Sequence, residues 1–128
     1  MFLRQKVELR MILETIIQRY FETVDANGIE DILLLFDENA IYDRPGYPLI
    51  CGRDELRVFY SNTRKIAAGE HTISDVIVQG RKAACRGRFK GLLRDGSSID
   101  VYFADVYSFD PLRDVIIERT TFFYVPLV

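Results

Sequence analysis

The segment Ile99–Asp110, IDVYFADVYSFD, places a carboxyl group where an apolar side chain is expected. With the two-residue period of a β-strand, the more apolar face carries Ile99, Val101, Phe103, Asp105, Tyr107 and Phe109. Burying an unpaired carboxylate is costly, so such a group either takes up a proton or finds a basic partner. Asp105 is therefore a candidate pocket acid, and the alternative is an ion pair with a residue such as Arg44 or Arg119.

Three further side chains have types that could do chemistry. Tyr20 lies on the apolar stripe of a helical segment, where it is either a core residue or a hydrogen-bond donor to a ligand. His71 is the only histidine and is either a base near neutral pH or a hydrogen-bonded residue at the start of a strand. Glu118 either points inward, so that it and Asp105 share one proton in a confined site, or is a surface or interface charge.

Helices followed by strands must position these residues. Asn27-Gly28 ends a first amphipathic helix, whose apolar stripe is Leu9, Ile12 or Leu13, Ile16, Tyr20 and Val24. A second helix turns Ile29, Ile32, Leu33 and Phe36 inward, and a third runs from about Gly52 to Gly69. Residues 39–45 read as a strand, and after Gly69 the period changes to two, which predicts strands at 71–78, 83–93, 99–109 and 115–124. Helices followed by an antiparallel meander predict an α+β domain.

The last of these strands, 115–124, is apolar on both alternating faces. A sheet that is apolar on both faces needs two covers, and three helices cover only one. We therefore expect a homodimer that forms through the sheet.

Composition excludes several classes of function. A chain of 128 residues with 48% hydrophobic residues and a net charge of −2 predicts one globular domain, 1–128, with no affinity for nucleic acid. The apolar runs are too short to span a membrane, and the N-terminus is charged from residue 4 onward. Two cysteines far apart predict free thiols and a cytoplasmic protein, and a single histidine argues against a metal site, so no metal or cofactor is expected.

The one basic run, in residues 80–94, places Arg86, Arg88 and Lys90 on one face of a strand. A site for single-stranded nucleic acid needs aromatic platforms on that same face, and Phe89 lies on the opposite one. We interpret the run as a solvent-exposed or dimer-edge face that pairs with acidic residues such as Asp100.

Three stretches resemble segments of one known superfamily: QRYFETVDANGIEDILLLFDENAIYDRPG, GRDELRVFY and ADVYSFDPLRDVIIERTTFF. They are similar to the nuclear-transport-factor-2-like proteins, which include ketosteroid isomerases and SnoaL-type polyketide cyclases. The resemblance covers nearly the whole chain. It implies a cone-shaped, cystatin-like α+β fold, in which three N-terminal helices pack on a bent antiparallel sheet around one pocket.

The resemblance also assigns roles to individual residues. It implies that Tyr20 and a neutral Asp105 donate hydrogen bonds to an oxyanion, as in ketosteroid isomerases, where an apolar site keeps the aspartic acid protonated. Tyr60 matches a tyrosine that hydrogen-bonds the first one, with Phe59 beside it. Further pocket residues are expected at Tyr47, His71, Phe103, Glu118 and Phe122.

The general base is where this sequence departs from the family. The family has an aspartate directly before a proline, whereas here Arg44 precedes Pro45 and Asp43 lies one residue earlier. A shift of one residue along a strand reverses the face on which a side chain lies. Either Asp43 enters the pocket through a local shift, or Arg44 enters it and the isomerase base is absent.

These features predict a small enzyme that acts on an apolar, carbonyl-containing molecule by proton abstraction and oxyanion stabilisation. Asp43, or failing that His71 or Glu118, would move the proton. The alternatives are a non-catalytic binder of a small apolar ligand and a hydrolase resembling the limonene epoxide hydrolases, in which carboxylates activate a water molecule.

Overall fold

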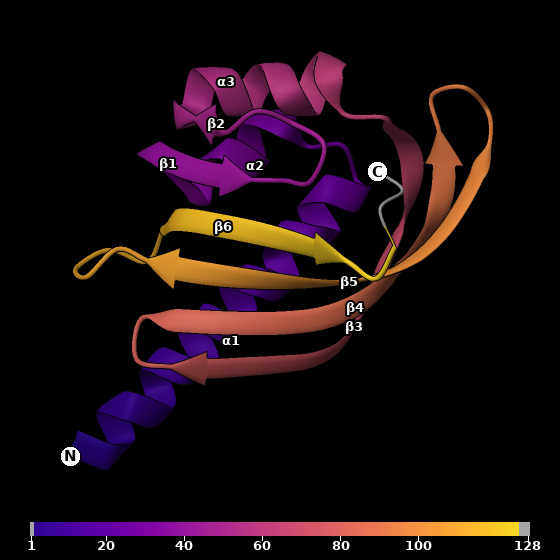
Figure 1. The fold of residues 1–128 in the computed structure, drawn as a ribbon. Helices are drawn as coiled ribbons and strands as arrows, with labels where there is room; N and C mark the ends of the chain where they lie inside the picture. The colour runs from indigo at the N-terminus through magenta and orange to yellow at the C-terminus, as the bar shows by residue number, and fades with distance from the viewer. Residues whose placement is uncertain (1, 126–128) are drawn as a thin grey trace.

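The computed structural model describes residues 2–125 and confirms the predicted α+β class (Figure 1). The elements follow in the order α1 (Phe2–Asp25), α2 (Ile29–Leu34), β1 (Phe36–Asp43), β2 (Ile50–Cys51), α3 (Gly52–Val58), a π-helical turn η1 (Phe59–Thr63), β3 (Ile66–Gln79), β4 (Lys82–Leu93), β5 (Ser98–Phe109) and β6 (Ile116–Phe123). Within residues 2–125, no helix has the length and the apolar character needed to cross a membrane.

One six-stranded sheet, in the order β2-β1-β6-β5-β4-β3, organises the domain. Its neighbouring strands are antiparallel except for β1 and β6, which run parallel. The expectation of a wholly antiparallel sheet is therefore wrong at this one pair. Because β1 and β6 stand far apart in the sequence, the parallel pair brings Tyr42 and Asp43 opposite Arg119 and Thr120.

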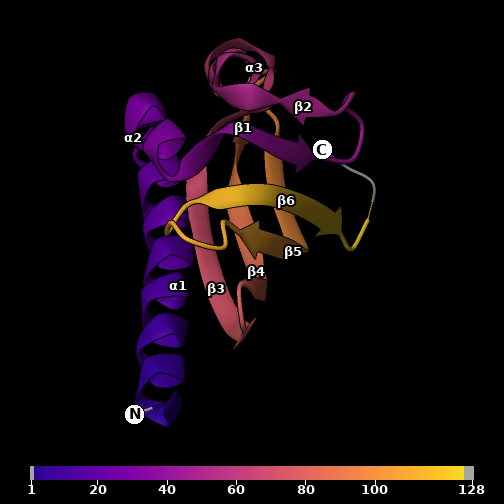
Figure 2. The same ribbon diagram turned by 90° about the vertical axis from the view of Figure 1, so that its left-hand side faces the viewer.

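Helix α1 covers one face of the long strands β3 and β4 (Figure 2). Its buried stripe contains Leu13, Ile16, Tyr20 and Val24, as the helical periodicity predicts, and also Ile17 and Phe21. The helix ends where expected, because Asn27 adopts a left-handed conformation with φ of 57°. The C-terminal end of α1 thus holds Tyr20 and Asp25 against the inner face of the sheet.

A sharp bend in β3 and β4 curls the sheet toward α3 (Figure 1). Gly69 and Gly91 are paired at this bend. A Cβ atom on Gly91 would lie 2.2 Å from the carbonyl oxygen of Ala68, and one on Gly69 would lie 2.2 Å from the ring of Phe89. Only glycine permits so close an approach. The strand before the bend begins at Ile66, so the expected helical end at Gly69 is wrong: the helix ends in the η1 turn at Thr63.

A β-bulge in β6 decides which of its side chains face inward. Ser108 is paired with Glu118, yet Phe109 is paired with Ile116, so β6 carries one extra residue at this point. An extra residue reverses the alternation of side chains beyond it. After the buried Ile116, the inward residues are therefore Arg119, Thr121 and Phe123, while Glu118 and Phe122 point outward.

Candidate functional site

Asp105 is fully buried, on the face of β5 that the strand period predicts. Arg119 lies on the neighbouring strand β6, and its Nη2 donates to Asp105 Oδ2 at 2.9 Å. Thr121 donates to the other carboxylate oxygen, and Tyr107 donates to Oδ2 at 3.2 Å. Asp105 thus accepts hydrogen bonds on both oxygens, one of them from a guanidinium, which is the environment of an ionised carboxylate.

Arg119 is the centre of this buried cluster. Its Nη1 donates to the hydroxyl groups of Tyr20 and Tyr60, which also share a hydrogen bond with each other, as the resemblance implies. Burial opposes the charge of Arg119, but the carboxylate of Asp105 raises the pKa of the guanidinium well above its ordinary value. Burial also raises the pKa of both tyrosines, so their hydroxyl groups stay protonated at neutral pH.

This arrangement corrects the expected oxyanion hole of Tyr20 and a neutral Asp105. Both groups bind Arg119, and an ionised carboxylate accepts hydrogen bonds and does not donate them. The ion-pair alternative describes Asp105 correctly. The group left to stabilise negative charge is Arg119, whose Nε has no hydrogen-bond partner within the described residues.

Strand β1 turns Arg44 inward and Asp43 outward. Ala40 and Tyr42 are buried, Asp43 is exposed, and Arg44 is only 5% exposed because the two-residue alternation continues past the end of the strand. Asp43 therefore has no access to the interior, and the base expected there is absent.

His71 lies on β3 among the rings of Phe21, Phe89 and Phe103. Its Nδ1 is 2.5 Å from Oδ1 of Asp25, and its backbone N–H donates to the other oxygen of that carboxylate at 2.8 Å. An Nδ1–H that donates to Asp25 leaves Nε2 with a free lone pair. Burial lowers the pKa of His71 more than the hydrogen bond to Asp25 raises it, so the ring is neutral at physiological pH.

His71, Arg44 and Arg119 line one small cavity. The remaining lining is mostly apolar and consists of Ile66, Phe89, Val101, Phe103, Thr121 and Phe123. The cavity volume is about 10 Å³, roughly the space that one water molecule needs. The arrangement therefore combines a neutral base, two cations and apolar walls in a confined space that a ligand must enlarge.

The comparisons with known proteins identify the family. The family model described as a SnoaL-like domain matches residues 17–114. The chain belongs to the SnoaL-like family. No curated protein sequence matches this SnoaL-like protein significantly.

Solved structures share the fold of this SnoaL-like protein at low sequence identity. The epoxide hydrolase/cyclase-like enzyme SalBIII, described in pyran ring formation in the polyether salinomycin, is 19% identical, with a TM-score of 0.75 over 87% of this chain and 89% of that one. A protein with a ketosteroid isomerase-like fold from Catenulispora acidiphila DSM 44928, in complex with trimethylamine, is 14% identical, with a TM-score of 0.74 over 84% and 83%. A protein with a cystatin-like fold from Methylobium petroleophilum PM1 is 16% identical, with a TM-score of 0.75 over 93% and 80%. The resemblance to the nuclear-transport-factor-2-like superfamily, drawn from the sequence, is confirmed.

The remaining predicted pocket residues of the SnoaL-like protein separate into two groups. Phe103 lines the cavity, and the rings of Phe59 and Tyr47 lie 5.4 Å and 6.0 Å from the guanidinium carbon of Arg44. Glu118 and Phe122 are exposed on the outer face of the sheet. The expectation that these two line the pocket is wrong, because the bulge in β6 turns them outward.

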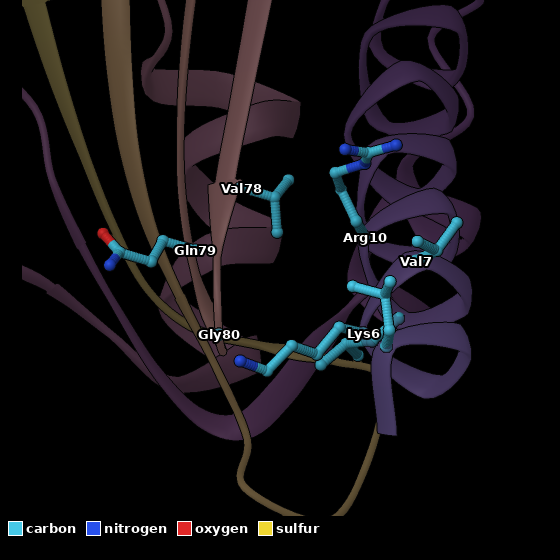
Figure 3. A pocket seen from close by; sticks show the side chains of 8 residues that line it. Lys6, Val7, Arg10, Val78, Gln79 and Gly80 are labelled. Atoms are coloured by element: carbon cyan, nitrogen blue, oxygen red, sulfur yellow. The ribbon is translucent and has the colours of Figure 1, made fainter. Parts of the chain in front are cut away.

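The described residues 2–125 of the SnoaL-like protein also line hollows away from this cluster. A groove of about 360 Å³ between the first half of α1 and the end of β3 is lined by Lys6, Val7 and Arg10 and by Val78, Gln79 and Gly80. Val78 points toward α1, whereas the side chain of Gln79 points away from it (Figure 3). None of the predicted site residues lines this groove. On the basic face of β4, Arg88 pairs with Asp100 at 2.6 Å, which confirms the expected acidic partner.

Cys85 contributes no nucleophile to the site of the SnoaL-like protein. Its Sγ lies 4.0 Å from Asp105. Burial, together with the charge of Asp105, raises the pKa of the thiol to about 12, so the reactive thiolate is not populated at neutral pH.

The sequence did not predict Asp25, Tyr42, Tyr107 and Thr121 as site residues of the SnoaL-like protein, and it gave Arg119 only as an alternative partner of Asp105. Asp25 and His71 are 46 residues apart, and no local pattern predicts their contact. Tyr42 was predictable, because it lies two residues before Arg44 and therefore faces the same side of the strand. Thr121 would follow from its position opposite Asp105, but only once the bulge in β6 is known.

Proposed function

We propose that this SnoaL-like protein is an enzyme that removes a proton from the carbon next to a carbonyl group of a small organic substrate. His71 is the base and Arg119 stabilises the resulting enolate. The observation that carries this proposal is that a neutral histidine, held by Asp25, lines the same cavity as an arginine with an unused Nε–H. Enolate formation needs a base to take the proton and a positive group beside the carbonyl oxygen, and both line this one cavity.

The proposed step balances with the groups in the site. The substrate C–H bond breaks and its proton goes to Nε2 of His71, while the electron pair moves to the carbonyl oxygen. The oxygen becomes an enolate beside Arg119, whose position is fixed by Asp105, Tyr20 and Tyr60. In an unsaturated substrate the enolate is conjugated with a carbon–carbon double bond, and return of the proton from His71 to the far carbon of that bond completes an isomerisation. Alternatively, the carbanion attacks a second carbonyl group of the substrate, and the proton from His71 passes to the new alkoxide oxygen to complete a cyclisation.

The test measures exchange of carbon-bound protons in deuterium oxide by NMR, with a panel of small cyclic ketones and oxo acids. We expect the protein to accelerate exchange of at least one compound over buffer, and His71→Asn to remove the acceleration. The asparagine amide can still donate to Asp25 but does not take up a proton. If every compound that binds exchanges at the buffer rate, the proposal is wrong.

The second candidate function is a non-catalytic binder of a small ligand. The exposure of Asp43 favours it: Arg44 occupies the position before Pro45 where the isomerases have their base, and the aspartate beside it faces solvent. Saturable binding without accelerated exchange in the same experiment would select this function.

We also propose that two copies associate through the outer face of β5 and β6. Tyr102, Phe122 and Tyr124 are 56%, 55% and 85% exposed there and help to line a hollow of about 580 Å³. Exposed aromatic residues grouped in one patch are typical of association surfaces.

Light scattering coupled to size exclusion at micromolar concentration is expected to give twice the 14.9 kDa mass of the chain. Phe122→Glu should give the monomer mass, because it places a charge in the interface. Ile77→Glu, at an apolar residue that is 68% exposed on β3, is the matched control and should leave the dimer intact. A wild-type protein with the monomer mass would refute this assembly.

A further inference from the structure

The interior of the protein holds more positive than negative charge. Among residues 2–125, the buried charged side chains are three arginines, Arg44, Arg64 and Arg119, and one carboxylate, Asp105. Asp105 pairs with Arg119 and balances that charge. No buried carboxylate in this part of the chain is left for the other two arginines.

Arg44 is the unbalanced cation that reaches the cavity. It is 95% buried, since only 5% of its surface is exposed, and the one hydrogen bond of its side chain to the described residues goes from Nη1 to the Tyr42 hydroxyl at 3.0 Å. Its Nε has no partner there. A buried cation with a neutral partner alone is costly, so this site favours an anion.

The surroundings of Arg44 restrict the kind of anion. The guanidinium carbon lies 5.4 Å from the ring centre of Phe59 and 5.2 Å from that of Phe123, and the rings hold the group by cation–π contacts. The planar fork of arginine matches a carboxylate with two parallel hydrogen bonds. Flat apolar walls beside the fork suit an organic carboxylate better than a small hydrated inorganic ion.

Arg44 is also connected to the group that we propose for enolate stabilisation. The Tyr42 hydroxyl, which accepts from Arg44, bonds Thr121 Oγ1 at 2.7 Å, and Thr121 in turn donates to Asp105, the partner of Arg119. One hydrogen-bonded chain thus fixes Arg44 and Arg119 relative to each other. Both arginines line the same cavity, so a molecule whose carboxylate binds Arg44 has its other atoms in the space that Arg119 also lines.

We infer that the substrate is a small oxo acid whose carboxylate is bound by Arg44 while its carbonyl group is activated beside Arg119. The inference rests on the proposed function for the chemistry of the carbonyl group. The binding of the carboxylate stands on its own observations. Because the cavity holds about 10 Å³, the Arg44 side chain or the rings around it must move to admit the ligand.

The test uses benzoate and its neutral counterpart benzamide as probes, with binding followed by calorimetry and by the NMR signals of arginine Nε–H groups. We expect benzoate to bind at least about tenfold more tightly than benzamide, a difference of about 1.4 kcal/mol, and to shift the Arg44 Nε–H signal. Arg44→Met should remove the preference for benzoate, and Asp43→Asn, one residue away on the exposed face, should preserve it. Equal affinities for the two probes, or a preference that survives Arg44→Met, would overturn the inference.

Two further measurements separate this inference from the proposed function and from an effect on folding. His71→Asn should bind benzoate as wild type does, even though it no longer catalyses proton exchange. If wild type binds benzoate but does not accelerate exchange of any compound, the proposed function is rejected and the carboxylate site is kept. The urea midpoint of Arg44→Met should equal or exceed that of wild type, because removing an unpaired buried charge does not destabilise. A clearly lower midpoint would assign Arg44 to the core and overturn the inference.

Discussion

Asp105→Asn is expected to lower the free energy of unfolding by about 3–5 kcal/mol, because it leaves Arg119 as a buried cation without its counter-charge. Asp105 is fully buried, Arg119 is 3% exposed, and their charged atoms are 2.9 Å apart. The asparagine keeps the size of the side chain, so the lost stability comes from the missing charge and not from a cavity. Urea unfolding at neutral pH measures it.

Two variants control this experiment. Asp43→Asn removes a carboxylate from the exposed face of β1 and should change stability by less than about 0.5 kcal/mol. Asp105→Leu combined with Arg119→Met replaces the pair by apolar side chains and should recover most of the loss, as buried ion pairs often allow. If Asp105→Asn is as stable as wild type, Asp105 is a neutral acid and the ion pair has been misread.

His71→Asn is expected to lower kcat of the proposed proton transfer by about 10²–10⁴-fold, the usual contribution of a general base. KM should change little, because the carboxylate of the substrate is bound by Arg44. Glu22→Gln, on the exposed side of the helix that carries Asp25, is the control and should leave kcat unchanged. Steady-state kinetics on the substrate found by proton exchange give both constants.

The pH profile distinguishes a base from a residue that only supports the fold. Burial lowers the pKa of His71 below 6.5, so kcat/KM should be constant above neutral pH and fall as the pH drops through this lowered pKa. The hydrogen bond to Asp25 raises the pKa of His71; Asp25→Asn should therefore move the fall in activity to still lower pH. A profile that is unchanged in Asp25→Asn would reject Asp25 as the positioning residue.

Local periodicity predicts the parts of this fold in which one pattern continues without interruption. The stripe of α1 and the alternating face of β5 were predictable because each is uniform over its whole length. Asp105 is buried at its predicted position for this reason. The inward side of β6 was not predictable, because one extra residue before Glu118 reverses the alternation and leaves no mark in the composition.

Some of the predicted site residues meet in the interior, but the contacts between them were predicted only in part. Tyr20, Tyr60 and Asp105 meet in the interior, yet their roles depend on Arg119. Arg119 contacts them because the bulge in β6 turns it inward. Ala40 and Tyr42 are buried on β1, so the alternation of the strand turns Arg44 inward and Asp43 outward. The contact of His71 with Asp25 depends on how α1 lies across β3, which no short segment encodes.

Alternate residues of β5 and β6 serve opposite faces of the sheet, and this has a thermodynamic consequence. Asp105 and Thr121 are paired across the two strands on the inner face, while Phe122 and Tyr102 stand beside them on the outer face. In the proposed dimer, association through the outer face and ligand binding on the inner face would therefore act on the same backbone. Any effect of one on the other must be reciprocal: a ligand that tightens the dimer by some factor binds the monomer more weakly by that same factor. Dilution of the protein is then a means of measuring the coupling, with no mutation required.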